Sequence, residues 1–234
     1  MAFILPQIEQ QPLFDQAEFP RNDFFNGVRD SVENVLVPLY RCPSTALPDQ
    51  FTTSTPNAMI PDYVAISGNV GGFGGLPGPT SQTDNFAFGI VARNGIFYDN
   101  STTTIADIRD GSSNTLMVSE TGDFLNLGGE LEDVRAGSQH GFHAGWQFNT
   151  SSHRLFNCVT MRFVINPGSS FEFTTDSTDG VSRLGHNSPL RSGHPGGVQG
   201  LLGDASVQFI SDTLAPETLA QLSNRFDGEV IGEF

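Results

Sequence analysis

The chain has no lysine: its 11 basic residues are all arginine, against 26 acidic residues. Without a lysine amine the chain cannot form a Schiff base, use a Ser-x-x-Lys nucleophile or bind phosphate through a P-loop lysine. The formal net charge of −15 repels a phosphate backbone, so nucleic acid is excluded as an expected partner. An acidic surface of this kind favours solubility in salt or the binding of cations.

Long apolar stretches and cysteines are also scarce. No stretch approaches the roughly 20 apolar residues of a membrane span, so none is expected within the chain. The two cysteines are Cys42 and Cys158. Two well-separated cysteines fit either one disulfide in an oxidising compartment or two buried thiols in a reducing one, and the sequence spacing leaves both open.

Glycine and proline, in contrast, are abundant, at 26 and 14 residues, and 20 phenylalanines supply apolar side chains for a core. This composition, with only 16% charged residues, is typical of a β-rich domain with many turns. No repeat and no long linker divides the chain. We therefore expect a single α+β domain over residues 1–234: an antiparallel sheet of short strands, helices near both termini, and long loops between residues 45 and 105.

Local patterns place the helices and strands. Apolar residues at helical spacing predict a short helix within the first 19 residues, interrupted by Pro6 and Pro12, and another at 215–226. The runs 198–202 and 206–210 predict a β-hairpin. Further strands are predicted at 62–68, 86–92, 95–99, 115–120, 161–166 and 171–175.

Sequence motifs for catalysis and for phosphate binding are missing. The glycine-rich segment 68–78 is followed by prolines rather than by a helix or Gly-Lys-Ser/Thr, so it predicts a mobile surface loop and not a phosphate cradle. The chain contains no Gly-x-Ser-x-Gly elbow and no cysteine–histidine signature. These features predict a protein that is not an enzyme.

Side chains able to bind metals gather in two kinds of segment. The first is a string of zinc-type ligands made up of His140, His143, His153 and Cys158. Its spacing matches none of the common structural zinc patterns, in which two ligands close together in sequence are followed by a second close pair. The second kind comprises the acidic turns Asp107/Asp110, Glu130/Glu132/Asp133 and Asp176/Asp179. None follows the EF-hand order, so solvated turns are expected. The sequence thus predicts no metal and no cofactor.

Four segments, in this order, resemble one bacterial family. They are Phe3–Gln16 (FILPQIEQQPLFDQ), Tyr40–Thr45 (YRCPST), Ile105–Glu120 (IADIRDGSSNTLMVSE) and Ser192–Asp212 (SGHPGGVQGLLGDASVQFISD). Together they are similar to prepilin-type, pseudopilin-like proteins of unknown function that carry a C-terminal H-x9-DG motif. The histidine and aspartate of that motif correspond to His194 and Asp204, and its last glycine is replaced by Ala205.

The resemblance implies an exported or envelope-anchored protein whose head follows a hydrophobic N-terminal helix. It implies oxidising conditions, and therefore a disulfide between Cys42 and Cys158. It assigns no role to His194 and Asp204. About ten residues of extended chain, at ~3.3 Å each, hold these two apart, so they are expected to cap a strand and its turn rather than share one site.

We accordingly expect a non-enzymatic head domain in the cell envelope or outside the cell. It would be a structural or assembly subunit of a pilus-like or type II secretion-like apparatus, with other pilin-like or envelope subunits as partners. The alternative is a glycan- or cation-binding extracellular module, for which Trp146 beside Phe148 could form an aromatic platform. The apolar start of the chain lacks a polar N-cap, which predicts a truncated form with an apolar patch where a helix once lay.

Overall fold

The computed structural model describes most of the chain. The described residues are 1–17, 32–50, 57–76, 82–85, 88–136, 140–149, 152–168, 173, 179–229, 231–232 and 234. For residues 82–85, 146–149 and 152–154 it describes the backbone alone. Within these ranges no helix has both the length and the apolar character needed to cross a membrane.

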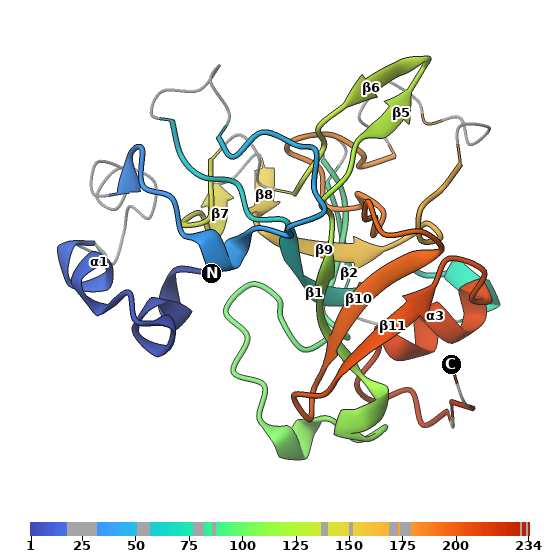
Figure 1. Cartoon of the computed structure of the whole chain (residues 1–234). Helices are drawn as coiled ribbons and strands as arrows, with labels where there is room; N and C mark the ends of the chain where they lie inside the picture. The colour runs from blue at the N-terminus through green and yellow to red at the C-terminus, as the bar shows by residue number, and fades with distance from the viewer. Residues whose placement is uncertain are drawn as a thin grey trace.

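A five-stranded sheet lies at the centre of the described structure (Figure 1). Its strands are, in spatial order, β11 (Val207–Ser211), β10 (Gly197–Leu202), β4 (Leu116–Glu120), β1 (Tyr63–Asn69) and β9 (Cys158–Met161). Neighbours pair antiparallel except β1 and β9, which run parallel. The α+β class is confirmed. The expectation of a wholly antiparallel sheet is wrong at this edge, since a long connection returns the chain to run alongside β1.

Three small two-stranded sheets surround the central one. They pair β2 (Gln82–Asn85) with β3 (Gly89–Ala92), β5 (Leu125–Leu127) with β6 (Glu130–Glu132), and β7 (Trp146–Asn149) with β8 (Ser152–Leu155). Short 3-10 helices are η2 (Pro38–Tyr40), η3 (Phe73–Gly75), η4 (Ile105–Asp107) and η5 (Ser112–Asn114). The predicted strand at 95–99 is wrong, that at 161–166 is wrong beyond Met161, and that at 171–175 lies outside the described residues except Phe173.

Helices occupy both ends of the chain, as expected. The N-terminal one is divided into η1 (Ala2–Ile8) and α1 (Gln11–Gln16). Glu9 ends η1 with a left-handed backbone (φ 62°), and Pro12 lies in the first turn of α1. The C-terminal helix α3 (Pro216–Leu222) starts at a proline. The first turn of a helix accommodates proline because a backbone N–H at that position, which proline lacks, would have no partner within the helix.

The predicted hairpin is confirmed, with Val198 opposite Ile210. In its turn, the N–H of Ala205 donates to the carbonyl of Leu202 (3.0 Å), and that of Leu202 donates to Ser206 (2.9 Å). Ala205 adopts a left-handed conformation (φ 68°). This arrangement is a type I turn followed by a bulge residue, a position that glycine normally occupies. The alanine therefore occupies a strained position.

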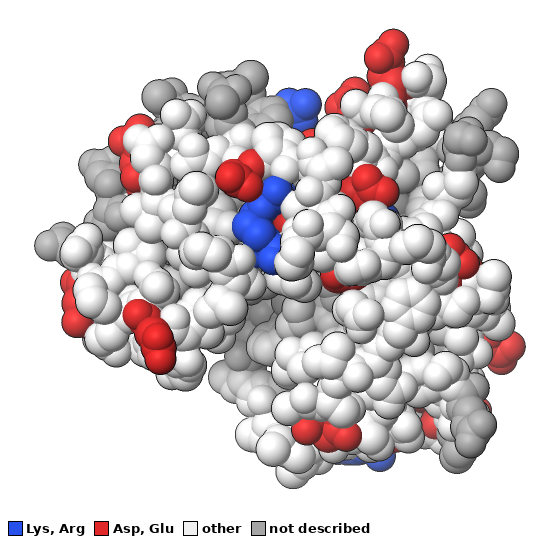
Figure 2. Space-filling model, viewed as in Figure 1, with Lys and Arg blue, Asp and Glu red and all other residues white. Residues whose placement is uncertain are grey.

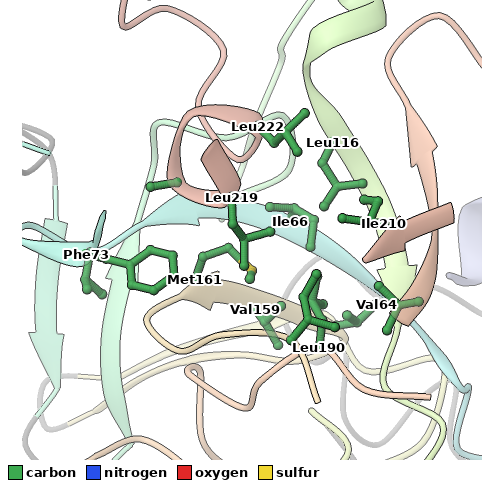
Figure 3. Close-up of a cluster of buried hydrophobic side chains, with 14 of the residues drawn as sticks. Val64, Ile66, Phe73, Leu116, Val159, Met161, Leu190, Ile210, Leu219 and Leu222 are labelled. Carbon is green, nitrogen blue, oxygen red and sulfur yellow. The ribbon is translucent and has the colours of Figure 1, made fainter. Parts of the chain in front are cut away.

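The main core lies between one face of the sheet and α3 (Figure 3). Alternate residues along each strand point to this face. In Figure 3, Leu219 and Leu222 of α3 face Ile66 and Met161 of the sheet. The other buried members include Val64, Phe73, Leu116, Val159, Leu190, Val198, Leu202 and Ile210.

The described part of the glycine-rich segment is not only a surface loop, because it begins in β1 and packs one side chain into this core. Phe73 is a buried core residue. Gly74 has φ 64°, and a Cβ placed there would lie 2.6 Å from the backbone of Pro216 and Glu217. Only glycine permits this close approach of η3 to the start of α3.

The N-terminal segment packs on a second, smaller cluster beside the sheet. Its buried members are Leu5, Leu13, Ala17, Val32, Val37, Tyr40, Met59 and Phe142. The Tyr40 hydroxyl donates to the carbonyl of Met1 (2.9 Å), which ties the start of the chain to η2. This segment therefore lies next to the second face of the sheet, away from α3 (Figure 1).

Candidate functional site

Three side chains with metal-ligand chemistry converge at one end of β4. Nε2 of His194 lies 3.5 Å from Sγ of Cys42 and 3.4 Å from Oε1 of Glu120. All three ligand atoms lie within 4.8 Å of one another. Cys42 and Glu120 are buried, whereas the His194 side chain is 30% exposed. Among the described residues this is the one group of three histidine, cysteine or acidic side chains so arranged.

Each of the three residues is positioned by a different part of the fold. Cys42 follows η2, Glu120 is the last residue of β4, and His194 precedes β10. The second carboxylate oxygen of Glu120 accepts the backbone N–H of Gln199 (2.8 Å), which leaves Oε1 directed to His194. The backbone N–H of His194 donates to the hydroxyl of Ser192 (3.2 Å).

A buried charge network lies behind Cys42. The carboxylate of Asp62 accepts hydrogen bonds from the backbone N–H of Cys42 (2.9 Å), from Arg41 (3.1 Å) and from Arg135 (2.7 Å). Arg135 also pairs with Asp133 at 2.6 Å. Burial raises the pKa of Asp62, and the arginines oppose that shift by favouring its ionised form. The network fixes the backbone on which the cysteine stands.

The cluster does not have the geometry of a cysteine–histidine–acid triad. In such a triad the nucleophile and the acid contact opposite ring nitrogens, so that the imidazole can relay a proton. Here Cys42 and Glu120 both contact Nε2 of His194. Burial raises the pKa of the Cys42 thiol, and the nearby carboxylates of Glu120 and Asp62 raise it further. A protonated thiol is a poor nucleophile.

An apolar groove of about 510 Å³ adjoins the same strands. One wall comes from the N-terminal segment and η2, and the floor comes from the sheet face opposite α3. The groove is lined by Met1, Ile4, Ile8, Leu39, Tyr40, Tyr63, Val118, Ser119, Gln199, Gly200, Leu201 and Val207. Figure 2 shows the hollow between the N-terminal segment and the β10–β11 hairpin, with a basic side chain at its upper end. The side chains that line the groove itself are uncharged.

The floor of the groove includes a row of apolar residues across three neighbouring strands. Val207 of β11 pairs with Leu201 of β10, and Leu201 pairs with Val118 of β4. Val207 is 63% exposed. These strands thus carry apolar side chains on both faces, and α3 covers only one of them.

The cysteines are not bridged, so the predicted disulfide between Cys42 and Cys158 is wrong in this structure. Both are buried and free. The fold carries them to different surroundings: Cys42 meets His194, whereas Cys158 lies in β9 and its thiol donates to the carbonyl of Phe97 (3.2 Å).

His194 and Asp204 occupy opposite ends of β10, as the sequence predicts. Asp204 lies in the hairpin turn, where its carboxylate accepts the backbone N–H (2.9 Å) and the hydroxyl (2.6 Å) of Ser206. These hydrogen bonds lower the pKa of Asp204. Its role here is to stabilise a turn.

The metal-ligand candidates of the sequence have other surroundings. The His140 ring lies 4.7 Å from that of Phe156, and that of His143 packs edge-on to Phe142. Of the acidic turns, Asp107 caps η4 through Thr104, Asp133 pairs with Arg135, and Asp110 accepts two backbone N–H groups. The side chains of His153, Trp146 and Phe148, and the whole of Asp176, lie outside the described part.

Sequence patterns alone do not single out Glu120, and they leave Cys42 either as half of a disulfide or as a buried thiol, not as a ligand. A signal was nevertheless present in the sequence. Cys42, Glu120 and His194 lie in three of the four segments that carry the family resemblance, and Met1, Ile4 and Ile8 of the groove lie in or beside the fourth. The segments recognised as one set along the chain therefore meet in space.

Comparison with known proteins gives a family and no function. No curated protein and no solved structure has a significant match to the chain. A family model described as "Protein of unknown function (DUF1559)" matches residues 1–217. Since this match covers nearly the whole chain, the protein belongs to the DUF1559 family.

Proposed function

We propose that this chain is the non-enzymatic head domain of an assembly subunit in the cell envelope or outside the cell. The observation that carries the proposal is the apolar groove on the sheet face opposite α3. Three large apolar residues that line it remain 46–65% exposed: Ile4, Leu39 and Val207. An apolar surface of this kind, uncharged on a chain of net charge −15, is typical of a protein interface.

The occupant that fits this surface is a second copy of the chain. The groove and the exposed apolar side chains lie on the same face, so two copies can bury each other's apolar residues there. Acidic repulsion between copies is lowest where no charged side chain lines the contact. The pilus-like or type II secretion-like setting rests on the resemblance of the four sequence segments.

The non-enzymatic part of this proposal is supported by the geometry of the cluster of Cys42, Glu120 and His194. The thiol of Cys42 has a raised pKa, and His194 uses one nitrogen for both of its neighbours. Neither feature supports nucleophilic catalysis.

Photo-crosslinking in the bacterium that encodes the protein tests the proposal. A photoreactive amino acid replaces Val207 in the gene at its own locus, and Leu131 of β6, also exposed at 69%, receives it as the matched control. We expect a crosslinked pair of copies in the envelope or extracellular fraction from the Val207 site alone. Recovery of only uncrosslinked chain, or of the chain in the cytosol, would contradict the proposal.

A further inference from the structure

We propose that Cys42, Glu120 and His194 bind a transition-metal ion of the zinc type. This inference is independent of the proposed function, because it rests on the side-chain cluster and not on the groove. The site differs from the histidine–cysteine string considered from the sequence, since Cys42 and Glu120 are not part of that string.

The donor set selects the class of metal. A thiolate, an imidazole and a carboxylate are the three protein ligands that zinc uses. Calcium and magnesium take oxygen ligands almost exclusively, so a sulfur and a nitrogen disfavour them. The mixed set therefore fits Zn²⁺ or Co²⁺ better than the hard cations.

The separations between the donor atoms fit the edges of a coordination tetrahedron. With metal–ligand bonds of about 2.0–2.3 Å, neighbouring donors of a tetrahedral zinc site lie roughly 3.3–3.8 Å apart. The Sγ–Nε2 and Nε2–Oε1 separations are 3.5 and 3.4 Å. The third, between Cys42 and Glu120, is within 4.8 Å, so a small side-chain rotation completes the triangle.

The surrounding groups hold the ligands in place. The Gln199 N–H fixes one oxygen of Glu120 and leaves the other for the ion, which is the usual support around a metal-binding carboxylate. The loop carrying His194 is pressed against that of Cys42: a Cβ on Gly193 would lie 2.8 Å from the carbonyl oxygen of Ser44. A glycine is therefore needed to bring the two ligand loops together.

One side of the cluster is open to solvent. His194 is partly exposed, whereas Cys42 and Glu120 are buried, so an ion can enter from the histidine side. On binding, the Cys42 thiol loses its proton to solvent as the sulfur–metal bond forms. Three protein ligands leave a fourth position, which a ligand supplied by a partner would fill to give the closed four-ligand set of a structural site.

The test titrates the reduced, metal-free 234-residue chain with Zn²⁺ against a chromophoric chelator, and then with Co²⁺. We expect one equivalent bound and a thiolate-to-cobalt charge-transfer band. Cys42→Ser and His194→Ala each remove a ligand and should weaken Zn²⁺ binding at least ~100-fold. This is more than the loss expected when a residue that only supports a ligand is changed. Cys158→Ser, which removes the other buried thiol, should bind as the wild type does.

The proposal is overturned if the wild-type chain leaves Zn²⁺ with the chelator, or if binding survives both ligand substitutions. Equal loss in Cys158→Ser would also overturn it. Circular dichroism without metal checks the fold of each variant. If Cys42→Ser does not fold, the test rests on His194→Ala, because the His194 side chain is partly exposed and its loss disturbs the core less. Val207→Asp, which alters the groove, should keep the metal affinity and so separates this proposal from the proposed function.

Discussion

Asp62 accepts a 2.7 Å hydrogen bond from Arg135, and neither side chain is exposed to solvent. The same carboxylate accepts the backbone N–H of Cys42. The carboxylate of Asp62 thus joins the segment before β1 both to Arg135, which follows β6, and to the segment that carries the thiol. Because both charges are buried, removal of one leaves the other without full compensation.

Asp62→Asn should lower the free energy of unfolding by about 3 kcal/mol, the lower end of the range for a broken buried pair, because Asp133 still pairs with Arg135. Asp99→Asn is the matched control. It breaks the half-buried pair with Arg93 and should cost less than about 1 kcal/mol. Urea unfolding measures both. Equal costs would show that burial of the pair does not matter.

Asp227→Asn should stabilise the protein at neutral pH. Burial, and then the charge of Asp110, raises the pKa of Asp227 to about 6. A carboxyl with a raised pKa favours the fold when protonated, and this contribution is lost as pH rises through 6. The gain from asparagine should be on the order of 1 kcal/mol at pH 7.5, after allowance for solvent screening, and should vanish near pH 4.

Thermal unfolding at the two pH values measures this difference. Asp204→Asn should behave in the opposite sense, because hydrogen bonds from Ser206 lower the pKa of Asp204 and its ionised form favours the fold. That variant should lose stability at neutral pH. A gain for Asp227→Asn that is the same at both pH values would contradict the titration argument.

Ala205→Gly should raise the free energy of unfolding by about 1 kcal/mol. Ala205 has φ 68°, a region that costs a residue with a Cβ about 1–2 kcal/mol and glycine very little. Ala220→Gly, inside α3, is the control with the opposite sign and should cost about 1 kcal/mol. Urea unfolding gives both values. Destabilisation by Ala205→Gly would show that the turn does not store this strain.

Val207→Asp should keep the purified chain monomeric. The wild type should self-associate as its concentration rises, because Val207 continues an apolar row over the floor of the groove. A charge there would have to be buried in the contact. Sedimentation velocity over a concentration series measures the association. Leu131→Asp, at an exposed site on β6, should associate like the wild type; association that both substitutions remove would point to a different surface.

Sequence patterns predicted well those elements that depend on neighbours along the chain. The β10–β11 hairpin and α3 follow from turn residues, alternation and a proline at a helix start, which act over a few positions. The absence of lysine and the acidic balance likewise restrict function without any structure. The conformation of Ala205 depends on the turn type, and the turn type depends on the loop length, which the sequence left open.

Contacts between distant segments were decided only by the tertiary structure. Cys42 and His194 are 152 positions apart, and their meeting depends on β4, β10 and the loop after η2 being placed together. The same holds for the parallel pairing of β9, for the burial of Arg135 against Asp62, and for the separation of the two cysteines. The sequence alone determined the charge and those local elements, such as the β10–β11 hairpin and α3, that depend on residues and their near neighbours. The cluster, the groove and the unbridged thiols depend on which surfaces pack together, and no short stretch of sequence encodes that.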